Sequence, residues 1–93
     1  MKKNKYKSLE DTLHLALLRA SVGKGADRHA NDNLFEEQDI LTEMEFLGIE
    51  PAIFQIRKKA KEALRLSKEA AKNEFLDIIV YAAAVVIKLN KKE

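Results

Sequence analysis

Cysteine and tryptophan are both absent from this 93-residue sequence. Without thiols, the chain has no disulfides, thiolate metal sites or cysteine nucleophiles, which fits a reducing cytoplasm. One proline and three glycines supply few turn signals, which argues against all-β sandwiches and barrels. The longest uninterrupted apolar run, residues 78–87, is about half as long as a membrane span. We therefore expect a soluble, cytoplasmic, all-α protein with no membrane partner.

The residues that are present suit one folded domain. Apolar residues make up 46% of the chain and charged residues 34%, which is ordinary for a folded helical protein. The net charge of +2 does not by itself indicate nucleic-acid binding. Four lysines lie within residues 1–7, so we predict a flexible basic tail there and a single helical domain over 8–93.

Apolar residues at helical spacing predict a bundle of about four helices, over residues 8–22, 34–47, 51–70 and 73–90. Glycines at positions 23 and 48 mark two helix ends, and Pro51 suits a first helical turn.

The last of these helices is apolar around its whole circumference. Between Phe75 and Leu89 only Asp77 and Lys88 are charged. Such a helix must be covered on all sides, and three other short helices can hardly enclose it. We therefore predict a buried C-terminal helix that packs in an obligate homo-oligomer.

The segment between the first two helices is long and polar. It contains Gly23, Lys24 and Gly25, followed by Arg28 and His29. Glycines let backbone N–H groups approach an anion, and the cations supply charge. This pattern predicts a phosphate site on Lys24, Gly25, Arg28 and His29, and the alternative is a solvated connector. Aromatic surface for a base could come from Tyr6, Phe35 or Tyr81.

Two pairs of carboxylates lie on different predicted helices. Glu36 and Glu37 open one helix, whereas Glu74 and Asp77 are three residues apart and share a helix face. Carboxylates on facing helices can bind Mg²⁺. In the alternative, Glu74 caps its helix and Asp77 pairs with a basic residue of the third helix.

The stretch from Glu74 to Ala82, with its Glu-x-x-Asp followed by an apolar helix, resembles the last metal-binding helix of MazG-like, all-α nucleoside triphosphate pyrophosphohydrolases. The resemblance implies Mg²⁺-dependent hydrolysis, with Glu36, Glu37, Glu74 and Asp77 as metal ligands. The family's Glu-Glu-x-x-Glu motif is incomplete, because Ile40 stands in place of its third glutamate. This departure favours nucleotide binding without hydrolysis.

The third predicted helix carries a row of basic residues, with Arg57, Lys61, Arg65, Lys68 and Lys72 spaced three or four apart. The row is either a solvated face or a rim that binds phosphate. Specific DNA binding is not favoured, because the helix offers only Gln55 and Ser67 for reading base edges.

The function expected from the sequence is binding and sequestration of a nucleotide or cyclic-nucleotide signal at subunit boundaries of a small helical homo-oligomer. In size, helicity and loop, the chain is similar to short phage proteins that sequester the cyclic nucleotides of bacterial immunity. That likeness implies an anti-defence role in a host cytoplasm. The alternatives are a Mg²⁺-dependent MazG-like pyrophosphohydrolase and a helical protein–protein interaction module.

Overall fold

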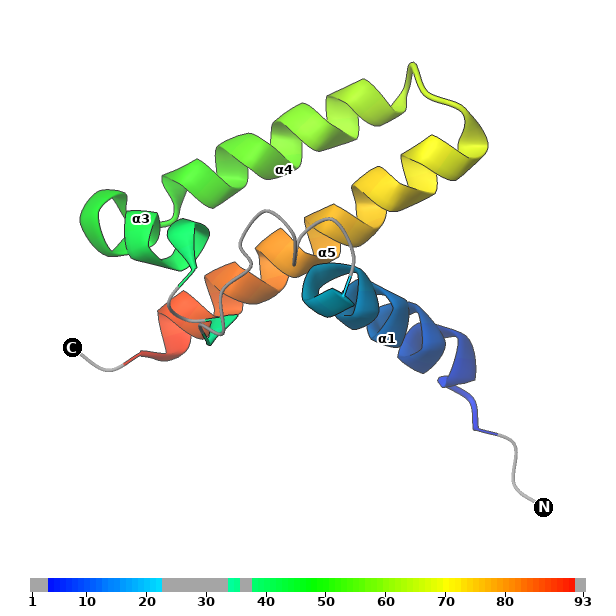
Figure 1. The fold of residues 1–93 in the computed structure, drawn as a ribbon, viewed down its shortest axis with the longest axis horizontal. Helices are drawn as coiled ribbons and strands as arrows, with labels where there is room; N and C mark the ends of the chain where they lie inside the picture. Colours follow the sequence, from blue (N-terminus) through cyan, green and yellow to red (C-terminus); the bar gives the residue numbers. More distant parts are fainter. Residues whose placement is uncertain (1–3, 23–33, 36–37, 92–93) are drawn as a thin grey trace.

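A computed structural model describes residues 4–22, 34–35 and 38–91 of the chain (Figure 1). Within these ranges the structure contains the helices α1 (Lys7–Val22), α3 (Asp39–Leu47), α4 (Glu50–Ala63) and α5 (Lys68–Asn90), and it contains no strand. The prediction of a small all-α fold is confirmed. None of the helices in the described ranges is long and apolar enough to cross a membrane.

The helices are arranged around α5. A short turn joins α4 to α5, and the two helices run antiparallel, side by side (Figure 1). Helix α3 lies at one end of this pair and contacts both members. Helix α1 meets α5 through its C-terminal half, and its N-terminal half points away from the other helices (Figure 1).

Glycine and proline mark the junction of α3 and α4 as predicted. Gly48 ends α3 with a φ of 76°, a left-handed conformation that favours glycine, and its N–H donates to the Met44 carbonyl at 3.0 Å. Pro51 lies in the first turn of α4. The predicted start of α3 at residue 34 is wrong, because Gln38 occupies its N-cap position and the helix begins at Asp39.

The predicted break between the last two helices is also misplaced. Helix α4 ends at Ala63 rather than near residue 70, and α5 begins at Lys68 rather than residue 73. Ser67 caps α5, since its side-chain oxygen accepts a hydrogen bond from the Ala70 N–H at 3.3 Å. The predicted basic row therefore does not lie on one helix: two members are on α4, two are on α5, and Arg65 lies in the turn.

Removing this cap tests the assigned boundary. We expect Ser67→Ala to lower the free energy of unfolding by about 1 kcal/mol, because the Ala70 N–H loses its acceptor. Ser21→Ala is the matched control, since the Ser21 hydroxyl only donates to the Leu17 carbonyl within α1. Urea denaturation of both variants measures the difference. Equal stability of Ser67→Ala and wild type would contradict the cap.

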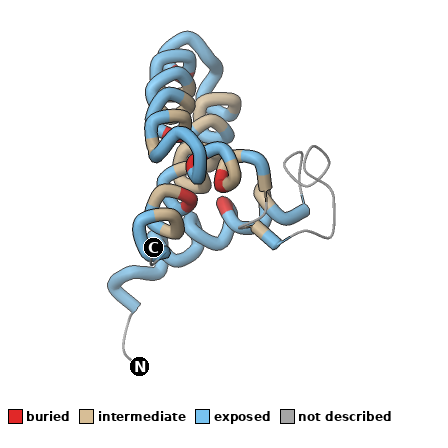
Figure 2. Tube along the Cα trace, turned by 90° about the vertical axis from the view of Figure 1, so that its left-hand side faces the viewer, coloured by how far each residue is buried: buried red, intermediate tan, exposed pale blue. Residues whose placement is uncertain are grey.

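The core is small and lies where α3, α4 and α5 meet (Figure 2). Its fully buried members are Leu41, Met44, Ala52 and Ala84. Phe35, Ile40, Ile49, Val85 and Ile87 pack against them and are partly buried. Helix α1 contributes to no part of this cluster, and its one buried residue is Ala16.

Much apolar surface stays exposed in the single chain. The other three helices do not enclose α5, in agreement with the expectation that they could hardly cover it: Ala84 is its only fully buried residue, and Phe75, Val86 and Leu89 are exposed. The accessible surface is 7651 Å², whereas a compact chain of this mass exposes about 5,500 Å². The radius of gyration of 14.5 Å likewise exceeds the roughly 12 Å of a compact chain of this length. The chain alone is therefore an open arrangement of helices.

Candidate ligand-binding cavity

A cavity of about 550 Å³ lies between the C-terminal end of α1, the start of α3 and the facing sides of α4 and α5. This volume falls within the range of small-molecule sites, roughly 300–1,000 Å³. The residues that line it are Arg19, Ala20, Phe35, Gln38, Asp39, Ile40, Glu43, Pro51, Phe54, Gln55, Lys59, Glu74, Asp77, Val80 and Tyr81.

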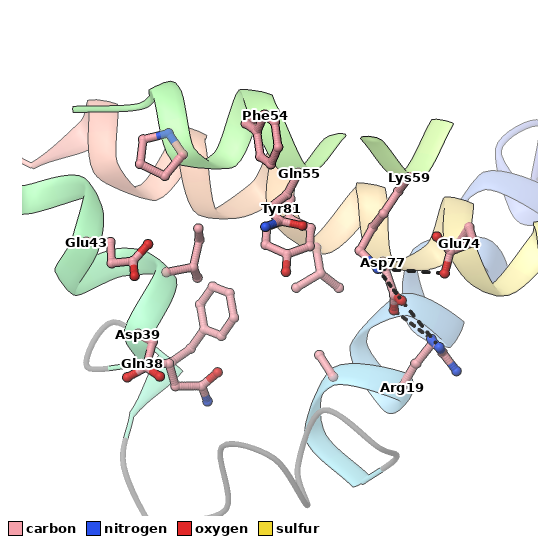
Figure 3. Close-up of a pocket in the computed structure, with 15 residues that line it drawn as sticks. Arg19, Gln38, Asp39, Glu43, Phe54, Gln55, Lys59, Glu74, Asp77 and Tyr81 are labelled. Atoms are coloured by element: carbon pink, nitrogen blue, oxygen red, sulfur yellow. Dashed lines mark hydrogen bonds and ion pairs between the residues drawn. The ribbon is translucent and has the colours of Figure 1, made fainter. Parts of the chain in front are cut away.

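One end of the cavity holds a cluster of four charged side chains from three helices (Figure 3). Arg19 of α1 forms a two-pronged contact with Asp77 of α5: Nε donates to Oδ1 at 2.6 Å and a terminal guanidinium nitrogen donates to Oδ2 at 3.3 Å. Lys59 of α4 approaches Asp77 Oδ2 at 3.5 Å and Glu74 Oε1 at 3.7 Å. This charged cluster ties α1 and α4 to α5.

The pairing is partly shielded from water. The side chains of Arg19 and Asp77 are 27% and 26% exposed, so their attraction is less screened than in a fully exposed pair. The hydrogen bond to Asp77 raises the pKa of Arg19 above its usual value, and burial opposes this rise only in part. Arg19 therefore stays charged at every pH at which the protein is handled.

Glu74 is incompletely satisfied in this cluster. Its Oε1 lies near Lys59, but its Oε2 is buried and has no hydrogen-bond partner. A buried acceptor without a donor costs free energy. The prediction that Glu74 caps its helix is wrong, because it lies two turns into α5 and Ser67 holds the cap. The prediction that Asp77 pairs with a basic residue of the third helix is confirmed by Lys59.

The rest of the cavity is aromatic and polar. Tyr81 of α5 and Gln55 of α4 lie between the charged cluster and the opposite end, where Gln38, Asp39 and Glu43 of the α3 region gather (Figure 3). Three of the six aromatic side chains of the protein line this wall: Phe35, Phe54 and Tyr81. The wall therefore combines apolar rings with amide and carboxylate groups.

The structure brings only some of the sequence-predicted site residues together. Phe35, Glu74, Asp77 and Tyr81 all line the cavity. Tyr6 does not, because it precedes α1 and is exposed. Six predicted residues lie outside the described ranges: Lys24, Gly25, Arg28, His29, Glu36 and Glu37. Residues 1–3 of the predicted tail also lie outside them, and Lys7 belongs to α1 rather than to the tail.

The described part of the chain contains no set of side chains that could serve as the metal ligands of the Mg²⁺-dependent alternative. There, no group of three or more His, Asp or Glu side chains lies close enough to hold a metal ion. Both oxygens of Asp77 face cations, and the position that Asp77 shares with Glu74 is occupied by the Lys59 ammonium, 3.5 Å from Asp77 Oδ2 and 3.7 Å from Glu74 Oε1. The remaining two family ligands, Glu36 and Glu37, lie outside the described residues.

Sequence reasoning did not assign six polar residues to the site: Arg19, Gln38, Asp39, Glu43, Gln55 and Lys59. Arg19 approaches Asp77 across 58 residues of chain, a separation that no local pattern reveals. Gln38 and Gln55 are isolated amides on different elements, and only the packing of α3 beside α4 brings both to one wall. Arg19 did carry one signal, because it is the one lysine or arginine of α1 after Lys7 and has apolar neighbours in the sequence.

A scan against protein-family models and searches of curated proteins and of solved structures found no match to this chain.

Proposed function

We propose that this protein binds a nucleotide-like ligand in the cavity between α1, α3, α4 and α5, and that it does so as a small homo-oligomer that holds the ligand intact. The observation that carries the proposal is the division of the cavity. An aromatic and amide region lies beside a region of Arg19 and Lys59, as a base and its phosphate require. Both regions fit within one volume of ligand size.

The base half of the ligand suits the wall near Tyr81. A nucleobase presents flat faces that stack on aromatic rings, and Phe35, Phe54 and Tyr81 offer such surface. Its edge carries donors and acceptors, which the amides of Gln38 and Gln55 can meet in both roles. Asp39 and Glu43 can accept from the amino and ring N–H groups of a purine.

The phosphate half needs more positive charge than the described wall provides. Four carboxylates line the cavity against two cations, Arg19 and Lys59, and both cations are already paired. The sequence supplies further cations in Lys24, Arg28 and His29. Ala20 and Phe35, which lie two or three residues from the two ends of the segment 23–33 in the sequence, both line the cavity. We propose that these cations complete the phosphate site.

The ion pairs of Asp77 with Arg19 and Lys59 favour sequestration of the ligand over its hydrolysis. The MazG-like alternative needs Asp77 as a metal ligand, but Arg19 and Lys59 occupy its oxygens. Ile40, in place of the third glutamate, lines the cavity as an apolar residue. Mg²⁺ prefers oxygen ligands, but Ile40 has none in its side chain and those of Asp77 are already paired with cations.

The ligand is identified from the protein itself. Chain purified under native conditions is denatured, and the released small molecules are analysed by mass spectrometry. We expect a nucleotide or cyclic nucleotide, recovered intact after incubation with or without Mg²⁺. Recovery of a hydrolysed product only when Mg²⁺ is present would favour the pyrophosphohydrolase. Protein that releases no nucleotide and binds none from a panel would favour the interaction module.

Replacing Tyr81 tests whether the base of the ligand stacks on this ring. We expect Tyr81→Leu to weaken nucleotide binding about 5- to 150-fold in titration calorimetry, because base stacking on an aromatic ring contributes roughly 1–3 kcal/mol. The matched control is Phe46→Leu, since Phe46 is an exposed ring of α3 that does not line the cavity. Equal affinity of the two variants would remove Tyr81 from the site.

A further inference from the structure

The turn between α4 and α5 exposes two leucines, which together form what we call the leucine tip. Leu64 is 87% exposed and Leu66 is 43% exposed, at the end of the α4–α5 pair that lies away from α3 (Figure 1). Most turns are built from Gly, Pro, Asn, Asp and Ser instead. Because Leu64 buries so little of its side chain, packing within the chain does not account for a leucine there.

The backbone of this turn is ordered without help from the leucine side chains. Its three N–H groups, from residues 64–66, donate to carbonyls of the last turn of α4 at 3.0–3.4 Å. Ser67 then caps α5. The leucine tip is therefore held in place by main-chain bonds, and polar residues can replace its side chains without loss of the turn.

Cations surround the leucine tip. Within about two helical turns of it, six exposed lysines and arginines outnumber two exposed glutamates. These six residues, which we call the cation ring, are Arg57, Lys58, Lys61, Arg65, Lys68 and Lys72. Five of them form the basic row of the sequence. The whole chain carries a net charge of only +2, so its positive charge is concentrated around this turn.

The cation ring lies on both outer faces of the helix pair. Lys59 points toward α5, since it pairs with Glu74 and Asp77. Lys61 is two residues farther along α4, about 200° around the helix, and so lies on the side away from α5. By the same spacing from Glu74, Lys72 lies on the side of α5 away from α4. Cations on both sides of an apolar tip fit end-on contact with a flat, negatively charged surface.

From these observations we infer that the leucine tip and the cation ring dock end-on onto an anionic lipid bilayer. The leucines enter the boundary of the acyl chains while the cations stay among the headgroup phosphates, as in other segments that bind membrane surfaces. The phosphates of a nucleic acid would also attract the cations, but they would offer Leu64 and Leu66 no apolar surroundings.

This docking surface is separate from the ligand cavity. The described lining of the cavity includes no residue of the leucine tip or the cation ring, so the inference does not depend on the proposed ligand. It departs from the expectation of no membrane partner, which rested on the lack of an apolar run long enough to span a bilayer.

Flotation of the full chain with phosphatidylcholine vesicles, with and without phosphatidylserine, tests the charge requirement. We expect binding only to the anionic vesicles, and weaker binding at high salt. Arg65→Gln combined with Lys68→Gln should weaken it roughly 25-fold, about 5-fold for each cation. The matched control is Lys5→Gln combined with Lys7→Gln, which removes two exposed lysines far from this turn and should change binding little.

Replacing the leucines tests whether the tip enters the bilayer. Leu64→Ser combined with Leu66→Ser should weaken vesicle binding about 10-fold or more and leave the circular dichroism spectrum unchanged. The matched control is Phe46→Ser, because Phe46 of α3 is also 87% exposed. Since the chain has no cysteine, a polarity-sensitive fluorophore can be attached to Leu64→Cys alone. Its emission should shift to the blue on anionic vesicles, and that of a label at Phe46→Cys should not.

Three results would overturn the inference, whatever the cavity binds. The first is no binding of wild type to phosphatidylserine vesicles. The second is vesicle binding that the leucine substitutions leave unchanged, or that the substitutions at Lys5 and Lys7 reduce as much as those at Arg65 and Lys68. The third is binding of a short DNA duplex in preference to vesicles, dependent on Arg65 and Lys68 but not on the leucines, which would make the partner a nucleic acid.

Discussion

The Leu41→Ala variant is expected to lose about 2–5 kcal/mol of unfolding free energy, the usual cost of a leucine cavity in a core. Leu41 has no exposed surface, and with Met44 it is one of the two largest fully buried side chains among the described residues. A 93-residue domain has about 5–14 kcal/mol in total. The loss therefore removes a large part of the stability and lowers the melting temperature by at least about 10 °C.

Leu47→Ala on the same helix is the control for this prediction. Leu47 is 64% exposed, so the same truncation there removes little buried surface. Thermal melts followed by circular dichroism measure both variants at one protein concentration, because assembly makes the melting temperature depend on concentration. Equal effects of the two truncations would show that α3 does not carry the core.

A second large effect is expected from Asp77→Asn. This change removes one negative charge and leaves Arg19 and Lys59 partly buried with Glu74 alone to neutralise them. We expect a loss of about 2–3 kcal/mol, below the cost of breaking a fully buried pair because a quarter of each side chain reaches water. This corresponds to a melting temperature lower by about 10–20 °C.

Asp11→Asn is the control for charge removal, because Asp11 pairs with Lys7 on the exposed surface of α1 and such pairs contribute little.

The melting temperatures of wild type and Asp77→Asn are also measured with millimolar Mg²⁺. We expect the same melting temperature for wild type with and without the ion, and the same deficit for Asp77→Asn in both. A rise in wild type that the variant lacks would instead make Asp77 a metal ligand.

The parts of the fold that were predictable depend on local chemistry. Gly48 ends α3 because its left-handed conformation disfavours other residues, and Pro51 opens α4 because the first turn needs no N–H from it. The sequence Leu64-Arg65-Leu66 contains neither glycine nor proline, so the turn before α5 carried no comparable signal. Only Ser67 marked it, and the other two serines of the chain, Ser8 and Ser21, both lie within α1.

The candidate site was predictable only in part for a related reason. The three-residue spacing of Glu74 and Asp77 places both on one face of any helix, and this holds in the structure. The partner of Asp77 from α1, Arg19, depends on how α1 crosses α5, which is a matter of tertiary packing. Exposure of Leu9, Leu13 and Leu17 on α1 also depends on tertiary packing, because their four-residue spacing is typical of a helix face that packs on a core.

The most direct test of a nucleotide site in the cavity is an amide chemical-shift titration of ¹⁵N-labelled protein with ATP, GTP and a cyclic dinucleotide. We expect saturable shifts with one of these probes at cavity positions such as Arg19, Gln55, Lys59 and Tyr81, while Phe46 and Leu89, which lie outside the cavity, stay unchanged. Shifts confined to the exposed basic residues Arg57, Lys61, Lys68 and Lys72, or no shift with any probe, would contradict the proposed function.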